Sequence, residues 1–378
     1  MSAGDLDGLE VGYDVPALPG MAAADVQTPA LVLDLDALEA NLDRMAAFAA
    51  EADVRLRPHA KMHRSADLAR MQIERGAVGL CCQKVSEAEA LVRGGVMDVL
   101  ITNEVRDPAK LARLARLPDR GATVGVCVDD AAGVAELVAV GADLDVYVEV
   151  DIGAGRCGVT PEEAAPLAQA VADAPGLRFA GVQAYHGNLQ HIADHAARAA
   201  AFEGAAQKAR AAVEAIKAAG LAVPQVTGAG TGTYEFEARS GLWTELQAGS
   251  YAFMDADYAG VLDETGHGLG DRWQHALFVL TQVMSTAPGR AVCDAGLKAH
   301  AVDSGLPTIW GHDGLQFVGA SDEHGEMRDP EGALSVGQKL RLVPGHCDPT
   351  CNLHDWYVGL RGGVVEAVWP VTARGKGF

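Results

Sequence analysis

The chain is poor in aromatic residues and in positive charge. Aromatic side chains make up 5% of its 378 residues, and 30 Lys and Arg stand against 51 Asp and Glu, which gives a formal net charge of −21. Such a surface repels nucleic acid and anionic membranes, and no long basic run offsets the excess of acid. We therefore expect neither kind of partner, and an anionic substrate would need a locally positive pocket.

Long apolar runs and closely spaced cysteines are missing as well. No stretch is long enough to span a bilayer, and residues 1–21 lack the basic and apolar regions of a signal peptide. The seven cysteines are odd in number and scattered, which favours reduced thiols and a cytoplasmic location. Hydrophobic residues still make up 49% of the chain, enough for a large core and two domains.

Strand-like and helix-like segments alternate through the first two thirds of the chain. Helix start signals lie between the strands, such as Asp107-Pro108 and the run 86–89, which has the pattern of a capping box. Eight β-α repeats predict an α/β fold, a closed parallel (β/α)8 barrel; an open doubly wound sheet would carry a phosphate loop after its first strand, and none appears there. The strand-like runs are 54–58, 78–83, 99–103, 123–128, 144–150, 179–185, 225–227 and 245–248.

The pattern changes after Tyr258. The runs 276–284, 291–294, 340–343 and 363–369 lie between turns and show little helical periodicity. We predict a barrel domain over residues 30–258, with a strand at 30–34 before its first helix. Residues 1–29 and 259–378 are predicted to form a second, mostly β domain.

Lys61 lies where the first barrel strand ends, and a barrel places its active site at the C-terminal ends of the strands. His59 and His63 flank the lysine at two-residue spacing, so on an extended chain all three side chains share a face. A lysine in this place can form an imine with an aldehyde cofactor, its amine activated by burial and neighbouring cations. The alternative is an ordinary solvated surface lysine.

A glycine-rich segment, 228–233, follows the seventh barrel strand, and Gly249-Ser250 follows the eighth. Backbone N–H groups and threonine hydroxyls of such a segment can cradle a phosphate, and barrels often bind phosphate there. It is not a dinucleotide fingerprint, because Thr233 stands where a third glycine is needed. A flexible loop without a ligand is the alternative.

Arg156 stands in a glycine turn after the fifth strand. Its charge is permanent, so a hydrogen bond from it to a pyridine nitrogen would leave that nitrogen largely unprotonated. A structural ion pair with Asp151 is the alternative.

His346 and Asp348 stand two residues apart near the C-terminus. On an extended chain both side chains face one way, and an imidazole with a carboxylate suits Mn, Mg or Zn. Cys347 and Cys351 could indicate zinc instead, although two thiols are too few for a closed structural site.

Taken together, these motifs resemble the D-threonine aldolase and D-serine dehydratase group. These are pyridoxal-phosphate enzymes with an alanine-racemase-like barrel and a C-terminal β domain. The resemblance covers nearly the whole chain and is carried by segments 28–30, 58–63, 82–89, 153–158, 183–187 and 344–348. Within the group, segments 12–20, 347–352, 354–357 and 373–377 are most similar to the 3-hydroxy-D-aspartate (β-hydroxyaspartate) aldolases.

The resemblance implies a role for each candidate residue. Lys61 would bind the pyridoxal 5'-phosphate aldehyde. The dehydratases of the group have a His-x-Cys pair that binds zinc, whereas this chain has aspartate at position 348. The divalent metal would therefore be Mg or Mn rather than Zn. The base would be His59, His63 or a metal-held hydroxide. The remaining implied positions are Arg156 at the pyridine nitrogen, Tyr185 near the ring, Thr231, Gly249 and Ser250 at the phosphate, Gln83 and Tyr258 elsewhere around the cofactor, and His346 and Asp348 at the metal.

The implied reaction is cleavage or formation of the Cα–Cβ bond of a β-hydroxy D-amino acid, with β-hydroxyaspartate giving glycine and glyoxylate. The alternatives are a D-threonine aldolase that releases acetaldehyde, a D-serine or 3-hydroxyaspartate dehydratase, and a cofactor-carrying barrel without catalysis. The resemblance also implies a homodimer.

Overall fold

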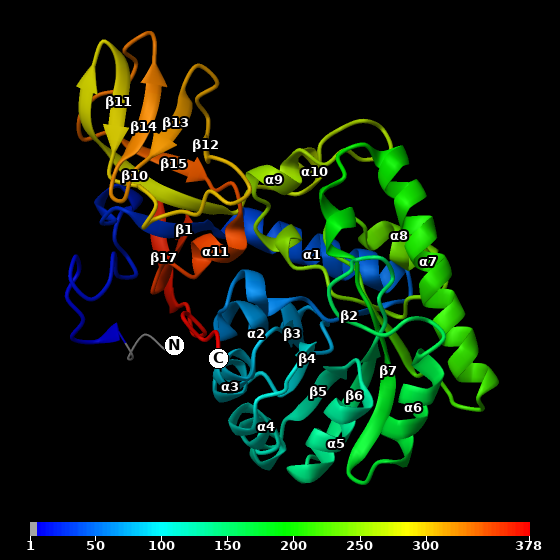
Figure 1. Ribbon diagram of the computed structural model, residues 1–378. Helices are drawn as coiled ribbons and strands as arrows, with labels where there is room; N and C mark the ends of the chain where they lie inside the picture. The colour runs from blue at the N-terminus through cyan, green and yellow to red at the C-terminus, as the bar shows by residue number, and fades with distance from the viewer. Residues whose placement is uncertain (1–5) are drawn as a thin grey trace.

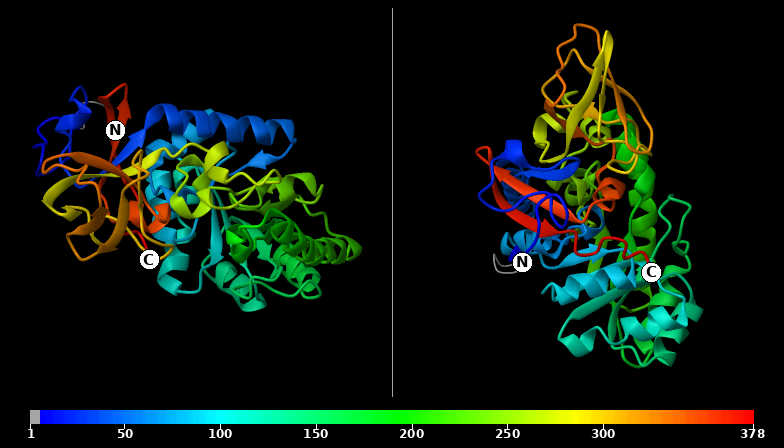
Figure 2. Two further views of the ribbon diagram at one scale, coloured as in Figure 1. Left: turned by 90° about the horizontal axis from the view of Figure 1, so that it is seen from above. Right: turned by 90° about the vertical axis from the view of Figure 1, so that its left-hand side faces the viewer.

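Residues 6–378 are described by a computed structural model, which has two parts joined side by side (Figure 1). One part is a parallel barrel surrounded by helices, and the other is mostly β-strand. In both views of Figure 2 the mostly β part lies beside the barrel. No helix among these residues combines the length and the apolar character needed to cross a membrane.

Eight parallel strands form the barrel. They pair in the order β2-β9-β8-β7-β6-β5-β4-β3. The ring closes between β2 and β3, where His59 bridges to Cys81 and the Cys81 N–H donates to the Pro58 carbonyl at 2.8 Å. Each predicted strand-like run overlaps one of these strands, and the predicted (β/α)8 barrel is confirmed. The strands are β2 (Arg55–Leu56), β3 (Leu80–Cys82), β4 (Asp98–Glu104), β5 (Thr123–Val128), β6 (Leu144–Glu149), β7 (Leu177–Ala184), β8 (Gln225–Gly228) and β9 (Glu245–Leu246).

The helices fall into two groups. Most of them surround the barrel, and the short helices α9, α10 and α11 lie nearer the second part (Figure 1). They are α1 (Leu35–Glu51), α2 (Ala66–Glu74), α3 (Val85–Arg93), α4 (Pro108–Leu114), α5 (Ala131–Ala139), α6 (Ala164–Asp173), α7 (His195–Ala218), α8 (Tyr234–Arg239), α9 (Ala256–Ala259), α10 (Leu269–Arg272) and α11 (Cys347–Cys351).

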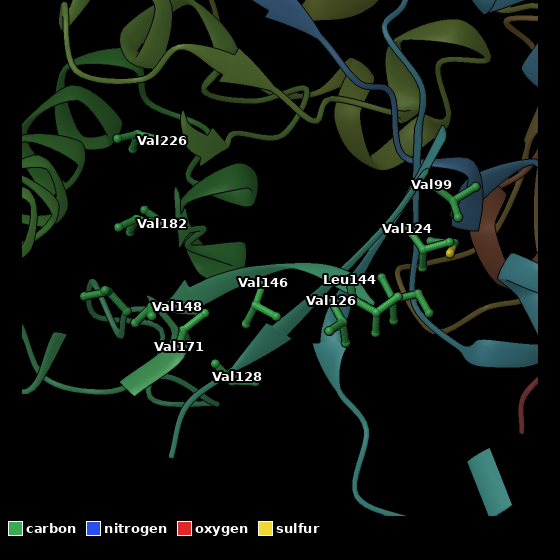
Figure 3. Close-up of a cluster of buried hydrophobic side chains, with 14 of the residues drawn as sticks. Val99, Val124, Val126, Val128, Leu144, Val146, Val148, Val171, Val182 and Val226 are labelled. Atoms are coloured by element: carbon green, nitrogen blue, oxygen red, sulfur yellow. The ribbon is translucent and has the colours of Figure 1, made fainter. Parts of the chain in front are cut away.

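The two faces of the barrel strands carry different side chains. Val124, Val126 and Val128 of β5 alternate along the strand and join the core between the sheet and the helices, with Val171 of α6 (Figure 3). Cys127, between two of these valines, belongs to a separate small interior cluster. This period of two is what a strand buried on both faces requires.

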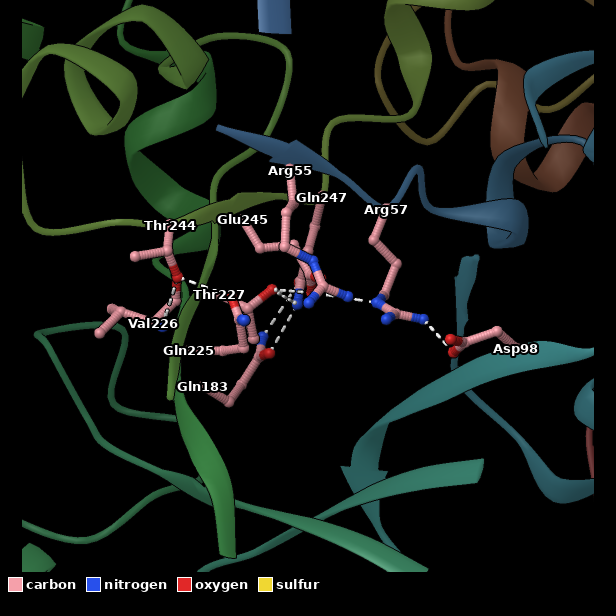
Figure 4. Close-up of polar contacts among 10 residues, drawn as sticks. All are labelled: Arg55, Arg57, Asp98, Gln183, Gln225, Val226, Thr227, Thr244, Glu245 and Gln247. Atoms are coloured by element: carbon pink, nitrogen blue, oxygen red, sulfur yellow. Dashed lines mark hydrogen bonds and ion pairs between the residues drawn. The ribbon is translucent and has the colours of Figure 1, made fainter. Parts of the chain in front are cut away.

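Farther along the barrel interior, polar side chains replace apolar ones (Figure 4). The Arg57 guanidinium donates to Glu245 at 3.0 Å, and the Thr227 hydroxyl donates to the same carboxylate at 2.9 Å. The amides of Gln183 and Gln247 bond each other reciprocally at 3.1 and 2.7 Å. Because buried polar groups are costly without partners, this paired layer makes a stable polar floor for a ligand cavity.

The second part is built on a nine-stranded sheet. Its long strand β10 pairs with β1, β11 and β15, and β1 pairs in addition with β16. The strands are β1 (Ala30–Asp34), β10 (Leu277–Ala287), β11 (Gly289–Cys293), β12 (Thr308–Ile309), β13 (Gln316–Ala320), β14 (Gly325–Asp329), β15 (Lys339–Val343), β16 (Trp356–Arg361) and β17 (Val364–Pro370).

Strand β1 corrects the predicted start of the barrel domain. The sequence analysis places residues 30–34 in that domain, whereas both edges of β1 are hydrogen-bonded within the second sheet. A single strand-like run cannot reveal which sheet it joins, because that depends on partners far away in the sequence. The division after residue 258 stays a prediction.

The helix start signals have mixed outcomes. Asp107 caps α4 as predicted, accepting from the N–H groups of Ala109 and Lys110. The capping box at 86–89 is wrong: α3 begins at Val85, so Ser86 lies inside the helix, and its hydroxyl accepts from the N–H of Phe378 at 3.1 Å. The serine therefore fastens the C-terminal segment to the barrel.

One hydrophobic core joins the two parts. Leu38 and Met45 of α1 pack in the same cluster as Phe253, which follows β9, and Tyr357 of β16. The Tyr357 hydroxyl also donates to the His63 carbonyl at 2.6 Å. This shared core holds the C-terminal segment against the first loop of the barrel.

Replacing Leu38 by alanine should weaken this junction. Leu38 is 1% exposed, so its loss leaves a cavity, and we expect a decrease of about 2–5 kcal/mol in the free energy of unfolding. Urea titration followed by circular dichroism measures it. Val336→Ala, at an apolar side chain that is 64% exposed, is the control and should change stability by less than about 0.5 kcal/mol. Equal effects of the two substitutions would refute the assigned role of the shared core.

Candidate active site

A cavity with about 910 Å³ of open space lies at the C-terminal ends of the barrel strands. Its walls come from the loops after the strands, as the barrel architecture requires. Every residue predicted to bind the cofactor lines it: Lys61, Gln83, Arg156, Tyr185, Thr231, Gly249, Ser250 and Tyr258. The sequence prediction therefore selected residues that the fold brings together.

Lys61 and Asp348 meet in this region although they come from opposite ends of the chain. The lysine Nζ lies 3.0 Å from Asp348 Oδ2. The nearby carboxylate raises the pKa of Lys61, and burial opposes this effect. The hydrogen bond from Tyr357 to the His63 carbonyl holds the two segments together close by.

The chain around Lys61 is not extended. Residues Ala60–Met62 form a 3-10 turn, and the His59 Nδ1 accepts from the Lys61 backbone N–H at 3.3 Å. His59 lines the cavity, but the His63 imidazole is buried between Gln72 and the Ser65 N–H. The expected shared face of the three side chains is therefore wrong, because the turn replaces the two-residue alternation of a strand.

Both histidines are neutral near pH 7. Burial, together with the charge of Lys61, lowers the pKa of His59 well below its ordinary value, and burial lowers the pKa of His63 to about 4. The Nε2 of His59 lies 3.1 Å from the Thr102 hydroxyl and 2.9 Å from the Gln83 amide. Both ring nitrogens of His59 are thus engaged within the protein.

Arg156 reaches the cavity from the loop after β6. Its guanidinium lies over the Tyr185 ring, 5.9 Å from the centroid, and 3.6 Å from Glu149. The alternative ion pair with Asp151 is wrong: that carboxylate accepts from the N–H groups of Gly153 and Gly155 instead. Burial and the adjacent Glu104 raise the pKa of Glu149 to about 8.

The loops after β8 and β9 form a close-fitting cradle. The Thr231 hydroxyl accepts from the Tyr251 N–H at 3.0 Å, which ties one loop to the other. A Cβ on Gly249 would lie 2.9 Å from the His59 carbonyl oxygen, and a Cβ on Gly230 would lie 2.4 Å from Gln190 Oε1. Glycine at both positions keeps the backbone close to the cavity, which fits a phosphate held by N–H groups.

His346 and Asp348 come together by a different geometry from the one expected. Their segment is not extended: His346 caps α11, and Asp348 lies in its first turn. The His346 Nε2 still lies 3.8 Å from Asp348 Oδ1. An imidazole nitrogen and a carboxylate oxygen at this spacing fit a divalent cation held between them.

The two cysteines beside this pair lie in the core and not in the lining of the cavity. Cys347 and Cys351 are fully buried where the two parts of the structure join. Burial raises the pKa of both thiols.

Several residues around the cavity escape sequence reasoning. Gln183 and Gln247 line its floor, and Gln190 fastens the glycine-rich loop by accepting from the Gly232 N–H. Asp303 contacts His346 from a loop of the second part. Gln183 begins the motif segment 183–187 but carried no predicted role, and the other three positions stand in no motif, so only the fold brings them to the site.

The chain matches the family model of the alanine racemase N-terminal domain over residues 33–257, and a model named for a serine dehydratase domain over residues 276–360. It is 56% identical over 382 residues to the 3-hydroxy-D-aspartate aldolase of Paracoccus denitrificans (strain Pd 1222), with 99% of each chain covered. It is 49% identical over 368 residues to the D-threonine aldolase of an Arthrobacter sp, with 95% of this chain and 96% of that one covered.

Among solved structures, the D-threonine aldolase from Filomicrobium marinum has a TM-score of 0.92 at 47% identity, and the match covers 96% of this chain and 100% of that one. The fold and the cavity thus define an enzyme of alanine racemase architecture with a second, mostly β domain. The chain belongs to the alanine racemase N-terminal domain family and, within it, to the group of the 3-hydroxy-D-aspartate and D-threonine aldolases. The resemblance drawn from the sequence is confirmed.

Replacing Glu237 by glutamine tests the electrostatics behind the glycine-rich loop. Glu237 of α8 is buried and accepts from the Thr233 hydroxyl at 2.7 Å. Burial raises its pKa from 4.5 to about 7. Between pH 4.5 and pH 7 this carboxyl is therefore protonated in the folded state and ionised in the unfolded state. The free energy of unfolding falls as the pH rises through this range, and the loss reaches about 3 kcal/mol above pH 7.

Glutamine cannot titrate, so the stability of Glu237→Gln relative to the unsubstituted protein should rise from pH 4.5 to 7 and then level off. Urea unfolding at a series of pH values measures the difference. Glu331→Gln, at an exposed glutamate, is the control and should show no such trend. A flat difference for Glu237→Gln would show that this carboxyl titrates normally.

Proposed function

We propose that this protein is a pyridoxal 5'-phosphate- and metal-dependent carbon–carbon lyase acting on β-hydroxy D-amino acids. The reaction is the interconversion of 3-hydroxy-D-aspartate with glycine and glyoxylate. The observation that carries the proposal is the 3.0 Å contact between Lys61 Nζ and Asp348 Oδ2, which puts the candidate cofactor lysine beside the candidate metal pair. The names of the aldolase relatives support the substrate.

The cavity residues fit the cofactor. Lys61 supplies the amine for its aldehyde, and Arg156, stacked beside Tyr185, supplies the permanent charge for its pyridine nitrogen. The cradle around Thr231, Gly249 and Ser250 would hold the phosphate. When bound, the cofactor supplies an electron sink for the pair released as the Cα–Cβ bond breaks.

His346 and Asp348 would hold a divalent cation. The Asp348 carboxylate favours a hard ion such as Mg or Mn, where a thiolate at this position would favour Zn. When bound, the cation supplies a Lewis acid that lowers the pKa of the substrate hydroxyl.

The two histidines that were predicted as bases are both held by hydrogen bonds within the protein. The hydrogen bonds of His59 and His63 occupy the nitrogens of both imidazoles within the protein. We therefore propose positioning roles for the two histidines in place of the predicted role as base. His59 orders the turn that carries Lys61 through its bond to the Lys61 N–H.

We propose further that the protein works as a cytoplasmic homodimer. The seven cysteines are all free thiols, as a reducing compartment would keep them. Large apolar side chains are exposed on the segment that includes Leu297, Val302, Leu306 and Trp310, which suits an interface between copies. Analytical ultracentrifugation gives the oligomeric state, and a monomer at micromolar concentration would reject the dimer.

Replacing Lys61 by alanine should remove the covalent attachment of the cofactor. We expect the visible absorption band of the bound cofactor to disappear and aldol cleavage to fall to background. Lys217→Ala is the control, since that lysine is exposed in the last turn of α7, and it should keep both properties. An unchanged spectrum with full activity in Lys61→Ala would refute the role of the lysine.

Product analysis decides between the aldolase and its alternatives. We expect 3-hydroxy-D-aspartate to give glycine and glyoxylate faster than D-threonine gives glycine and acetaldehyde. Chelation removes the cation, and Asp348→Ala removes one of its two protein ligands. Each treatment should therefore abolish both reactions. An oxo acid with ammonia would identify a dehydratase instead, and cleavage that survives both treatments would remove the metal from the reaction.

A further inference from the structure

The His346 imidazole lies between two carboxylates. Its Nδ1 lies 2.7 Å from Asp303 Oδ2, and its Nε2 lies 3.8 Å from Asp348 Oδ1. The first contact is a hydrogen bond, and the second is too long for one. The two ring nitrogens therefore face different partners, and only the nitrogen directed at Asp348 is left for a cation.

This arrangement has a chemical consequence for metal binding. A neutral imidazole carries one proton, so a ring that donates from Nδ1 to a carboxylate presents the lone pair of Nε2. Metal-binding histidines are commonly held in this way by a carboxylate on the far nitrogen, which fixes the tautomer and the direction of the ring. Asp303 stands where such a carboxylate belongs.

The loop that carries Asp303 is braced against the His346 segment at two further points. The Thr350 hydroxyl accepts from the Ala301 N–H at 3.1 Å and donates to the His346 carbonyl at 2.7 Å. On the other side of Asp303 the backbones nearly touch, since a Cβ on Gly345 would lie 2.2 Å from the Gly305 carbonyl oxygen. The contact of Asp303 with His346 is thus part of a fixed seam between two chain segments.

We propose that Asp303 is a positioning residue for the divalent cation: its carboxylate holds His346 in the tautomer and orientation that bind the ion through Nε2. The inference rests on the proposed function, because it takes His346 and Asp348 as the ligands. The alternative is an incidental surface ion pair, since the Asp303 side chain is 53% exposed.

Metal affinity separates the positioning role of Asp303 from an incidental surface ion pair. The protein is loaded with cofactor, freed of metal with chelator and titrated with Mn²⁺ alone, followed by calorimetry and by the electron paramagnetic resonance of free Mn²⁺. Asp303→Asn should weaken binding about 10- to 100-fold. Asp313→Asn, the same charge change at an exposed position of the same domain, should leave the affinity within a factor of about two.

A second readout follows the ring itself. At a pH high enough for the imidazole to be neutral, the ¹⁵N shifts of His346 in the metal-free protein should report a proton on Nδ1. Asp303→Asn should shift the population towards Nε2–H, because an asparagine can turn its NH₂ group to the ring. A purely structural role would leave this tautomer unchanged.

The possible results are distinct. Unchanged Mn²⁺ affinity or an unchanged tautomer in Asp303→Asn overturns the inference, and so does a loss as complete as that in His346→Ala, which would make Asp303 a ligand. If the unsubstituted protein binds no Mn²⁺, the proposed metal pair itself fails. Far-ultraviolet circular dichroism confirms that each variant is folded.

Discussion

The contact between Lys61 and Asp348 is the interaction on which the rest of the site depends. Nothing local creates it, because the lysine follows the first barrel strand and the aspartate lies in a short helix of the second domain. The apolar core shared by α1, Phe253 and Tyr357 seats one domain on the other. Since a shift of about 1 Å in a reacting group can lower a rate 10²-fold, this packing is a condition for catalysis.

The polar interior of the barrel is a second condition. Arg57 and Thr227 both donate to Glu245 in one layer, and Gln183 and Gln247 extend this layer to the cavity floor. An apolar filling would pack equally well but would offer a ligand no fixed dipoles. Because every partner in such a network holds the next, the layer orients side chains at the cavity without help from the ligand.

The cavity gathers cationic side chains on a chain that is acidic as a whole. The net charge is −21, yet Lys61 and Arg156 both reach the cavity. Each is matched within the fold by one carboxylate, Asp348 or Glu149. An anionic ligand therefore meets less repulsion in the cavity than on the acidic surface around it.

Much of this protein can be predicted from its sequence. The alternation of strand and helix signals predicts the barrel, and position at strand ends selects Lys61, Arg156 and the glycine-rich segment, because a parallel barrel places those ends on one face. The motif around His346 and Asp348 indicates a cation by ligand type alone. The prediction of the fold succeeds because it depends on local spacing, and the cation stays a prediction.

The tertiary structure decided what depends on residues far apart in the chain. It placed β1 in the second sheet, turned the chain at Lys61 so that His63 faces away from the cavity, and paired Arg156 with Glu149 instead of Asp151. It also brought Asp303 to His346. The sequence determined which groups are available, and the packing of two domains determined which of them touch, because contacts across a domain junction leave no periodic trace in the chain.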